Sequence, residues 1–257
     1  MCIFGKNCVK LIYIRALFSN VWKLYIGVMF VTTLLLFYPI LLLFLYVEPW
    51  KAKTFKVNIC WSRLMRMLCF YGVDVRGDAP TTQGEIIICA NHTSYLDIFM
   101  LYSALPQQKF IFMGKSEILS YPLVKTFFKR LNIPVFRGDR LKAAKSFIKA
   151  KQELLKGWSI VIFPEGGIPD DPPYIIPFKD GAFKLAKSAE VGVLPVTFIN
   201  NYRLFSDPEL VLGSAMPGLV KLKIHPFISA AEHNELSVME LNQKVFEFIA
   251  SSIDKKV

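Results

Sequence analysis

Apolar positions along this chain follow two different patterns. Residues 25–47 form a run of 23 almost entirely apolar residues without a single charge, whereas the rest of the chain alternates short apolar runs with segments of helical periodicity. A run of this length is sufficient to cross a bilayer core about 30 Å thick. It is also longer than the apolar core of a usual signal peptide. The pattern therefore predicts an N-terminal membrane-attached helical segment, with a buried helix of a soluble protein as the alternative.

Basic residues flank this run on both sides. Residues 1–24 mix Lys and Arg with large apolar side chains, which is typical of an interfacial amphipathic helix, and residues 56–72 predict a second one. Because cations lie on both sides, the positive-inside rule does not select an orientation. Pro39 interrupts the run, so we favour a re-entrant hairpin with both ends in the cytosol over a single span.

From residue 73 onward the pattern predicts one α/β domain, residues 73–257, after a membrane-associated region at 1–72. An edge strand at 73–77 and a polar turn at 78–83 open the domain. Ser237 and Glu240 form a capping box that begins the last helix. Alternation of strands and helices favours a mainly parallel sheet flanked by helices. The further strands are expected at 86–90, 109–113, 133–136, 159–163, 193–199 and 219–224, and helices after the first of these and at 140–156, 182–190 and 238–253.

Composition supports attachment to a membrane. Of the 257 residues 53% are hydrophobic, the mean hydropathy is +0.39, and the formal net charge is +11. Basic charge beside long apolar runs fits an anionic membrane or a phosphate-bearing lipid, and no nucleic-acid-binding motif is present. The five cysteines lack a Cys-x-x-Cys pair, which predicts reduced thiols facing the cytosol and neither a disulfide framework nor a zinc site.

Polar residues with catalytic potential follow the buried strand at 86–90. His92 comes directly after it, and Thr93 or Ser94 can cap a helix that carries Asp97 in its first turn. A carboxylate is stabilised at a helix N-terminus, so Asp97 can stay ionised and hold one imidazole nitrogen of His92. The other nitrogen is then free to act as a base. No nucleophile accompanies the pair, so the base is expected to act on a substrate hydroxyl.

Two further strand ends carry unusual residues. The strand at 133–136 is followed by Arg137, and the strand at 159–163 by Glu165, Gly166 and Gly167. In open α/β sheets, ligands bind beyond the carboxyl ends of the strands. Taken singly, an arginine or a glutamate in a loop is most often solvated or part of a turn. Together these residues predict a site with a base, an anion clamp and a glycine-lined loop.

Four ordered blocks make the sequence resemble the glycerophospholipid acyltransferase family, the membrane-bound enzymes that acylate glycerol 3-phosphate and lysophosphatidic acid. The likeness covers roughly residues 70–225. A segment at 178–183 also resembles the Lys-x-Gly-Ala stretch that usually separates the last two blocks. The blocks are Asn91-His92-Thr93-Ser94-Tyr95-Leu96-Asp97, Val135-Phe136-Arg137, Phe163-Pro164-Glu165-Gly166 and Val193-Leu194-Pro195-Val196.

The resemblance implies a role for each matching residue. His92 would be the general base that removes a proton from the acceptor hydroxyl, and Asp97 would orient it. The substrate-binding set comprises Asn91, Lys115, Arg137, Glu165, Gly166 and Lys179. Within that set Arg137, Lys115 and Lys179 would hold the acceptor's phosphate or another anionic head group, and Glu165 and Gly166 would line the acceptor site.

The resemblance also implies the partners of the reaction. They are a membrane lipid surface, a lysophospholipid acceptor, and an acyl thioester of acyl carrier protein or coenzyme A, without metal or cofactor. The catalytic domain would lie at the cell membrane and face the cytoplasm. The expected reaction is transfer of an acyl chain to 1-acyl-sn-glycerol 3-phosphate.

One departure from the family pattern opens alternatives. After Phe-Pro-Glu-Gly the family usually continues with Thr-Arg-Ser, whereas this chain has Gly167-Ile168-Pro169 followed by Asp170 and Asp171. A phosphate-binding arginine is thus missing, and two carboxylates would repel a phosphate. The alternative acceptor is a lyso-aminolipid of the ornithine or glycine type. A non-catalytic membrane-binding protein and a soluble thioester hydrolase are weaker alternatives; the latter lacks a Gly-x-Ser-x-Gly elbow.

Overall fold

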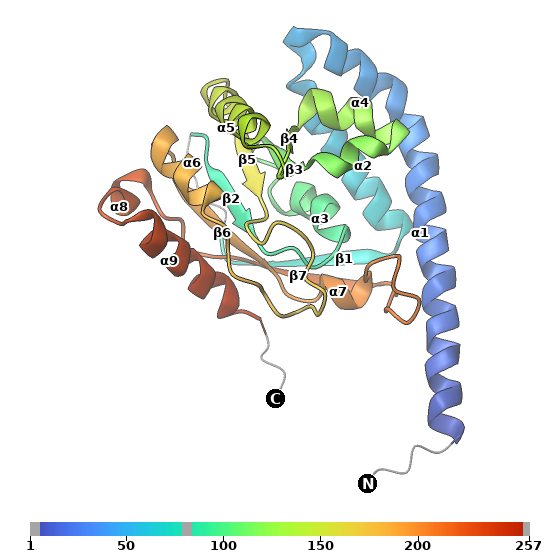
Figure 1. Ribbon diagram of the computed structural model, residues 1–257. Helices are drawn as coiled ribbons and strands as arrows, with labels where there is room; N and C mark the ends of the chain where they lie inside the picture. The colour runs from blue at the N-terminus through green and yellow to red at the C-terminus, as the bar shows by residue number, and fades with distance from the viewer. Residues whose placement is uncertain (1–5, 79–83, 254–257) are drawn as a thin grey trace.

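The computed structural model describes residues 6–78 and 84–253, in which a seven-stranded sheet lies between two layers of helices (Figure 1). In chain order the elements are α1 (Lys6–Tyr46), the 3₁₀ helix η1 (Glu48–Trp50), α2 (Lys53–Leu68), β1 (Tyr71–Arg76), β2 (Ile87–Ala90), α3 (Leu96–Ala104), β3 (Phe110–Lys115), η2 (Ser116–Ser120), α4 (Pro122–Leu131), β4 (Ile133–Val135), α5 (Arg140–Leu155), β5 (Ser159–Ile162), α6 (Gly181–Ala189), β6 (Val193–Phe198), α7 (Asn201–Leu204), β7 (Gly218–Ile224), α8 (Ala230–Asn234) and α9 (Val238–Ala250).

The sheet has the strand order β1-β7-β6-β2-β5-β3-β4. Strands β6, β2, β5, β3 and β4 are parallel to one another, β7 is antiparallel to β6, and β1 is parallel to β7. The predicted mainly parallel α/β fold is confirmed, including β1 as an edge strand. Most of the predicted turn at 78–83 lies outside the described residues. Since parallel strands point the same way, the carboxyl ends of five strands meet at one edge of the sheet.

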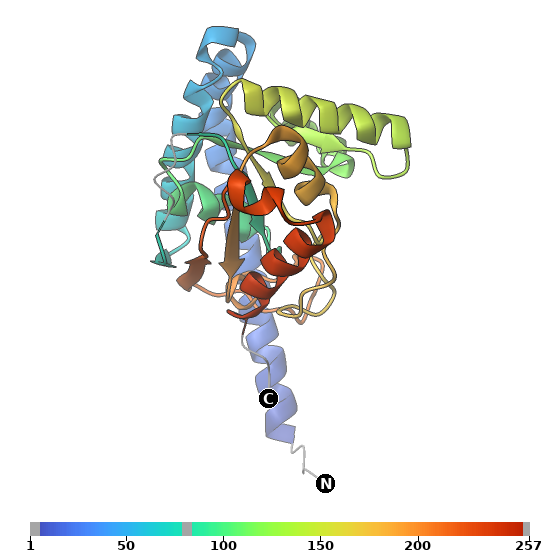
Figure 2. The same ribbon diagram turned by 90° about the vertical axis from the view of Figure 1, so that its left-hand side faces the viewer.

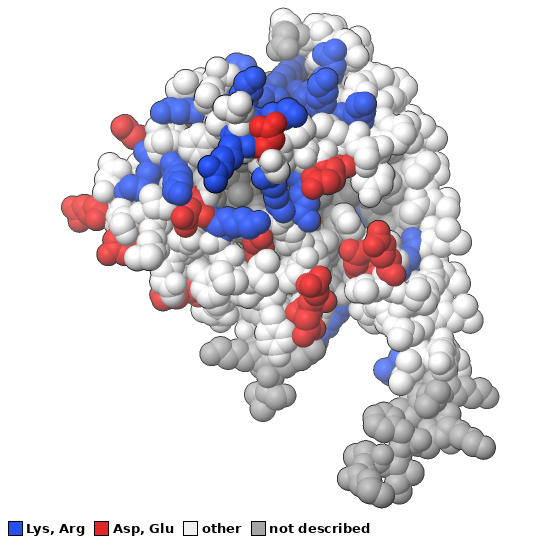
Figure 3. Space-filling view, in the orientation of Figure 1, with Lys and Arg blue, Asp and Glu red and all other residues white. Residues whose placement is uncertain are grey.

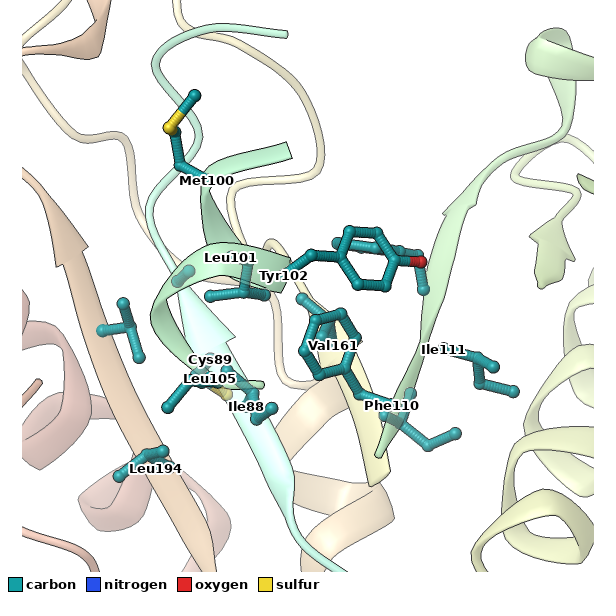
Figure 4. Packing of buried hydrophobic residues seen from close by; sticks show 14 of the residues in the cluster. Ile88, Cys89, Met100, Leu101, Tyr102, Leu105, Phe110, Ile111, Val161 and Leu194 are labelled. Carbon is teal, nitrogen blue, oxygen red and sulfur yellow. The ribbon is translucent and has the colours of Figure 1, made fainter. Parts of the chain in front are cut away.

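The core is built around β2, which is buried on both faces as its unbroken apolar sequence predicts. Leu101 and Tyr102 of α3 pack against the strands on one side, and the Tyr102 ring stacks on Phe110 with 4.8 Å between centroids. Figure 4 shows these α3 side chains beside Ile88 of β2 and Val161 of β5. This packing fixes the N-terminal end of α3 beside the carboxyl end of β2.

Helix α1 is continuous over 41 residues, and Pro39 lies inside it. Its segment Leu11–Tyr46 is long and apolar enough to cross a membrane. The predicted break at Pro39 is therefore wrong. The reason is local: Pro39 is on the exposed side, whereas Leu34 and Leu41 on either side of it are 2% and 0% exposed and hold the helix against the protein.

Along one side, α1 is bonded to the rest of the protein. Lys23 is buried and its Nζ donates hydrogen bonds to the backbone oxygens of Asp207 and Leu210, at 3.0 and 2.7 Å. Farther along, the indole of Trp61 donates to Thr33 Oγ1 at 2.9 Å. The predicted boundary between residues 72 and 73 falls inside β1, so the N-terminal helices share one core with the sheet.

Helix α2, predicted as an interfacial helix, turns its apolar side toward the protein. Phe55, Ile59, Trp61 and Met65 are buried, and Ser62 Oγ donates to the backbone oxygen of Phe99 at the centre of α3. The helix thus lies between α1 and the sheet layer. Other parts of the protein cover the apolar side of α2. The outer side of α1 is therefore the large exposed apolar surface of this region.

His225, which follows β7, makes the stability of the fold depend on pH. Its side chain is buried, its Nε2 lies 2.8 Å from Thr197 Oγ1, and Phe248 of α9 stacks beside it. Burial, assisted by the charge of Lys223, lowers the pKa of His225 to about 4. The folded protein therefore favours the neutral ring, and stability present above the unfolded-state pKa near 6.5 is lost as the pH falls toward 4.

We expect wild type to lose about 3 kcal/mol of unfolding free energy between pH 7 and pH 4 relative to His225→Gln, which cannot titrate. Thermal unfolding of both proteins in detergent across this range measures the difference, and other titrating groups cancel because both proteins carry them. If the difference in melting temperature between wild type and His225→Gln stayed constant from pH 7 to pH 4, the burial of a neutral His225 would be contradicted.

Candidate active site

The residues predicted from the sequence lie at the edge of the sheet where the five parallel strands end. The Lys179 backbone N–H donates to the backbone oxygen of Pro164 at 2.9 Å, which ties the start of α6 to the loop after β5. The structure therefore brings together segments that are up to about ninety residues apart in the chain. Lys115 ends β3, Arg137 follows β4, Asn91 and His92 follow β2, and Glu165 and Gly166 follow β5.

Asp97 is held in place by the first turn of α3. Its Oδ2 accepts the backbone N–H groups of Thr93 and Ser94 at 2.7 and 3.0 Å, while Ser94 Oγ accepts the N–H of Leu96 at 3.1 Å. The Asp97 side chain is completely buried. Hydrogen bonds from these backbone donors stabilise the carboxylate, as expected for an acidic residue at a helix start.

His92 and Asp97 form the predicted pair. His92 Nδ1 lies 2.9 Å from Asp97 Oδ2, so in the neutral ring Nδ1–H donates and Nε2 carries the basic lone pair. The His92 side chain is 13% exposed, and among the described residues nothing bonds its Nε2. The Phe163 ring stacks on the imidazole, with 4.1 Å between centroids and 17° between planes. The base is therefore fixed in one orientation with its reactive nitrogen available.

Asn201, at the start of α7, is a site residue that the sequence analysis missed. Its Nδ2 donates to Asp97 Oδ1 at 2.6 Å, and its side chain is completely buried. A signal was present in the sequence, because two asparagines follow the buried strand at 193–199 just as Asn91 and His92 follow β2. The hydrogen bond extends the chain of contacts to His92, Asp97 and Asn201.

Replacing Asn201 by alanine is expected to lower kcat about tenfold and to leave KM within about twofold, because Asp97 loses the one partner that its Oδ1 has among the described residues and holds His92 less precisely. Steady-state kinetics on the acceptor measures both constants. Asn200→Ala is the matched control, since the Asn200 side chain bonds the backbone of Leu219 and Lys221 and does not contact Asp97 among the described residues. An unchanged kcat in Asn201→Ala would show that Asn201 does not position the base.

The side chains of Asn91 and Glu165 bond the backbone near His92. Both polar atoms of the Asn91 amide bond the backbone of Phe198, at 3.0 and 2.7 Å, and link β2 to β6. The Glu165 oxygens accept the N–H groups of His92 at 2.8 Å and Ile176 at 3.3 Å. Asn91 and Glu165 are 0% and 2% exposed. In this arrangement their side chains hold the backbone around His92 in place.

Burial raises the pKa of Glu165 to about 7; the two backbone N–H donors oppose this shift, and the Asp97 carboxylate adds to it. Glu165 therefore changes protonation near neutral pH while it is bonded to the backbone of the base. The role of Glu165 in lining the acceptor site, which the family resemblance implies, stays a prediction.

Three cations converge on the glycine pair after β5. Arg137 donates a hydrogen bond to the Gly166 backbone oxygen. A β-carbon on Gly166 would lie 2.9 Å from both the Arg137 guanidinium and Lys179 Nζ, and one on Gly167 would lie 2.7 Å from Lys115 Nζ. Gly166 also has a φ of +84°, which favours glycine. The loop is thus lined by three exposed cations that meet at one point.

Comparisons with known proteins find a family and several similar sequences. A family model described as Acyltransferase matches residues 72–199. The chain is 28% identical over 222 residues to a 1-acyl-sn-glycerol-3-phosphate acyltransferase of Chlamydomonas reinhardtii, covering 84% of this chain and 64% of that protein. It is also 28% identical over 204 residues to the 1-acyl-sn-glycerol-3-phosphate acyltransferase of Escherichia coli K12, covering 75% and 79%.

The fold has a solved counterpart. The crystal structure of the 1-acyl-sn-glycerophosphate acyltransferase PlsC from Thermotoga maritima matches with a TM-score of 0.75 at 24% identity, covering 94% of this chain and all of that one. The chain spans about half to two thirds of the algal and plant relatives it matches, 64% in Chlamydomonas reinhardtii, 45% in Brassica napus and 54% in Arabidopsis thaliana.

Proposed function

Given that this chain belongs to the acyltransferase family, we propose that it is a membrane-bound O-acyltransferase acting on 1-acyl-sn-glycerol 3-phosphate. It moves an acyl chain from an acyl thioester to the free hydroxyl of this acceptor and gives phosphatidic acid. The observation that carries the proposal is the fixed His92–Asp97 pair, with a free Nε2, at the same sheet edge as three converging cations. The names of the relatives support the choice of acceptor.

The proposed chemistry is direct transfer. His92 Nε2 takes the proton of the acceptor hydroxyl while the oxygen attacks the thioester carbonyl carbon, and the C–S bond breaks as the tetrahedral intermediate collapses. The imidazolium returns its proton to the leaving thiolate. Asp97, buried beside His92 Nδ1, stabilises the imidazolium between these steps. Direct transfer needs no acyl-enzyme, and the nearby Ser94 Oγ is already bonded to the Phe205 backbone oxygen at 2.6 Å.

Arg137, Lys115 and Lys179 hold the acceptor phosphate in this proposal. They take over the role of the arginine that the family usually has two residues after Phe-Pro-Glu-Gly, where this chain has Ile168. The neighbouring Gly167 has no side chain and leaves room for the Lys115 ammonium to reach the loop. Guanidinium and ammonium groups both bind phosphate oxygens through charge-assisted hydrogen bonds.

Removal of the Arg137 guanidinium should therefore weaken acceptor binding. We expect Arg137→Ala to raise the KM for 1-acyl-sn-glycerol 3-phosphate about tenfold, with a smaller change in kcat, because one of three cations is lost. Initial rates at varied acceptor concentration measure this. Arg76→Ala, at the far edge of the sheet, is the control. An unchanged KM in Arg137→Ala would remove Arg137 from the phosphate site.

The function itself is tested with the purified protein in detergent. One acyl thioester is offered with lysophosphatidic acid, glycerol 3-phosphate or a lyso-aminolipid, and the His92→Ala protein is run in parallel. We expect acylation of lysophosphatidic acid that disappears in the variant. Acylation of the lyso-aminolipid alone would establish the second candidate, which the exposed Asp170 and Asp171 after Gly167 favour. No transfer to any acceptor would reject both.

Membrane attachment through α1 is part of the proposal. Its outer side is apolar along its length, with exposed fractions of 67% at Leu17, 70% at Leu24 and 70% at Leu36. We propose that this side contacts the cell membrane and that the catalytic domain faces the cytoplasm, where acyl carrier protein and coenzyme A thioesters are available. The reaction as proposed uses no metal or cofactor.

A further inference from the structure

Helix α5 presents an apolar ridge to solvent. Leu141, Ile148 and Leu155 are 77%, 57% and 84% exposed, and their seven-residue spacing puts them on one side of the helix. The opposite side carries Ala150 and Leu154, which are buried against the domain. An amphipathic helix that packs on a sheet normally points its large apolar residues inward, so this second, outward ridge is unexplained by the fold.

Basic side chains border the ridge on both sides. The helix and the residue that follows it contain a single acidic residue, Glu153, which is buried and paired with Lys51 and Lys156 at 3.3 and 3.0 Å. Within α5 itself the exposed surface therefore carries cations and no carboxylate, and Asp139, which caps the start of the helix, pairs with Lys142 at 3.3 Å. In Figure 3 Lys and Arg side chains gather over the upper half of this face, where α5 lies. The bordering cations are Arg140, Lys142, Lys145, Lys149, Lys151 and Lys156.

The ridge begins next to the candidate active site. Arg137 and the first residue of α5 are separated by two residues, so the N-terminal end of the helix lies beside the cation cluster. From Leu141 the ridge runs away from the site for roughly 20 Å, given the rise of an α-helix. A partner that covers the ridge would therefore be held at the mouth of the site.

Helices α5 and α1 lie on different sides of the sheet. The crossover β4–α5–β5 runs across the sheet in the direction opposite to β2–α3–β3, and both are right-handed, so α5 and α3 cover opposite faces. Helices α1 and α2 pack on the α3 side. Figure 2 shows α5 extending away from α1. Among the described residues, only the C-terminal end of α5 comes near the segment that follows α1, where Glu153 pairs with Lys51. A bilayer in contact with the apolar side of α1 thus leaves Leu141 and Ile148 in water.

We propose that the ridge of α5 and its bordering cations are the docking surface for a small acidic protein that carries the acyl thioester. Apolar contacts along Leu141, Ile148 and Leu155 give the interface its core, and the cations complement acidic side chains of the carrier and speed its association. The inference rests on the proposed function, since it assigns the donor of that reaction.

The test compares two donors on the same proteins in detergent. The donors are palmitoyl-acyl carrier protein and palmitoyl-coenzyme A. The double variant Lys145→Glu/Ile148→Glu changes the middle of the ridge. Lys244→Glu/Met239→Glu is the matched control on α9, where Met239 is 76% exposed and the Lys244 side chain is 40% exposed. We expect kcat/KM with the carrier protein to fall at least about tenfold in the ridge variant and to stay within about twofold with the coenzyme A thioester. The control should match wild type with both donors.

Other outcomes overturn the inference in distinguishable ways. An equal loss with both donors in the ridge variant would show that α5 is not a carrier-docking surface while the acyltransferase function stands. The same conclusion would follow if the wild-type protein used the coenzyme A thioester but not the carrier protein. Unchanged kinetics with weaker cosedimentation on phosphatidylglycerol vesicles would identify the ridge as a membrane contact. If no thioester is used at all, the proposed function fails, and binding of the carrier protein to wild type and ridge variant by calorimetry still decides whether the surface docks it.

Discussion

Changing His92 to alanine is expected to lower the rate of acyl transfer by about a thousandfold or more, the largest effect of any single substitution. The side chain supplies an imidazole nitrogen, Nε2, that has no hydrogen-bond partner among the described residues. General bases contribute typically 10²–10⁴-fold, and here the base also returns the proton to the leaving thiolate. The rate of thiol release from the donor, with the acceptor in excess, measures the loss.

His92→Gln separates the loss of the base from the loss of the hydrogen bond to Asp97. Glutamine keeps a side-chain amide that can donate to Asp97, but it has no group that takes a proton, so it should be as inactive as alanine. Near-UV circular dichroism and the melting temperature verify that each variant is folded. More than a tenth of wild-type activity in His92→Gln would show that another group is the base.

Changing Asp97 to asparagine is expected to lower kcat about a hundredfold to a thousandfold, less than the loss of His92. The amide keeps an oxygen toward His92 Nδ1 and toward the backbone donors of Thr93 and Ser94. Its NH₂ group can bond Asn201 Oδ1, which lacks a partner among the described residues. The geometry is thus retained, and the effect isolates the charge that stabilises the imidazolium.

The variant should also be less stable, by about 1–3 kcal/mol, because four hydrogen bonds to a buried carboxylate become bonds to a neutral group. Asp74→Asn on β1, far from the site, is the control for a charge change alone. Single-turnover kinetics separates the chemical step from product release. If Asp97→Asn retained near-full kcat, the carboxylate would have only a structural role.

Much of the site could be predicted because it depends on local features. A buried strand that ends abruptly in polar residues identifies β2, β4 and β5 from sequence alone, and parallel strands must bring their carboxyl ends to one edge. The pairing of His92 with Asp97 needs only the first turn of α3. The N-cap of this helix is Tyr95 and not Thr93 or Ser94 as predicted, although Ser94 Oγ accepts the N–H of Leu96. These inferences use neighbours within about five residues, where backbone geometry leaves few alternatives.

Other features depend on contacts between distant segments. The hydrogen bond between Asn201 and Asp97 spans 104 residues of sequence. Glu165 bonds the His92 backbone 73 residues away, which no local pattern specifies. The continuity of α1 through Pro39 likewise depends on packing by Leu34 and Leu41, which outweighs the helix-breaking tendency of proline. Tertiary contacts decided these points.

The two sides of α1 are subject to different selection. Inward residues such as Leu34, Leu41 and Leu45 fit a defined cavity of the protein, so a change in volume or shape is costly there. Outward residues such as Leu36 and Leu43 contact only fluid lipid chains in the proposed membrane, where any large apolar side chain is acceptable. The rate of substitution along this helix is therefore expected to vary with a period of 3.6 residues. It should be slow at inward positions and fast at outward positions.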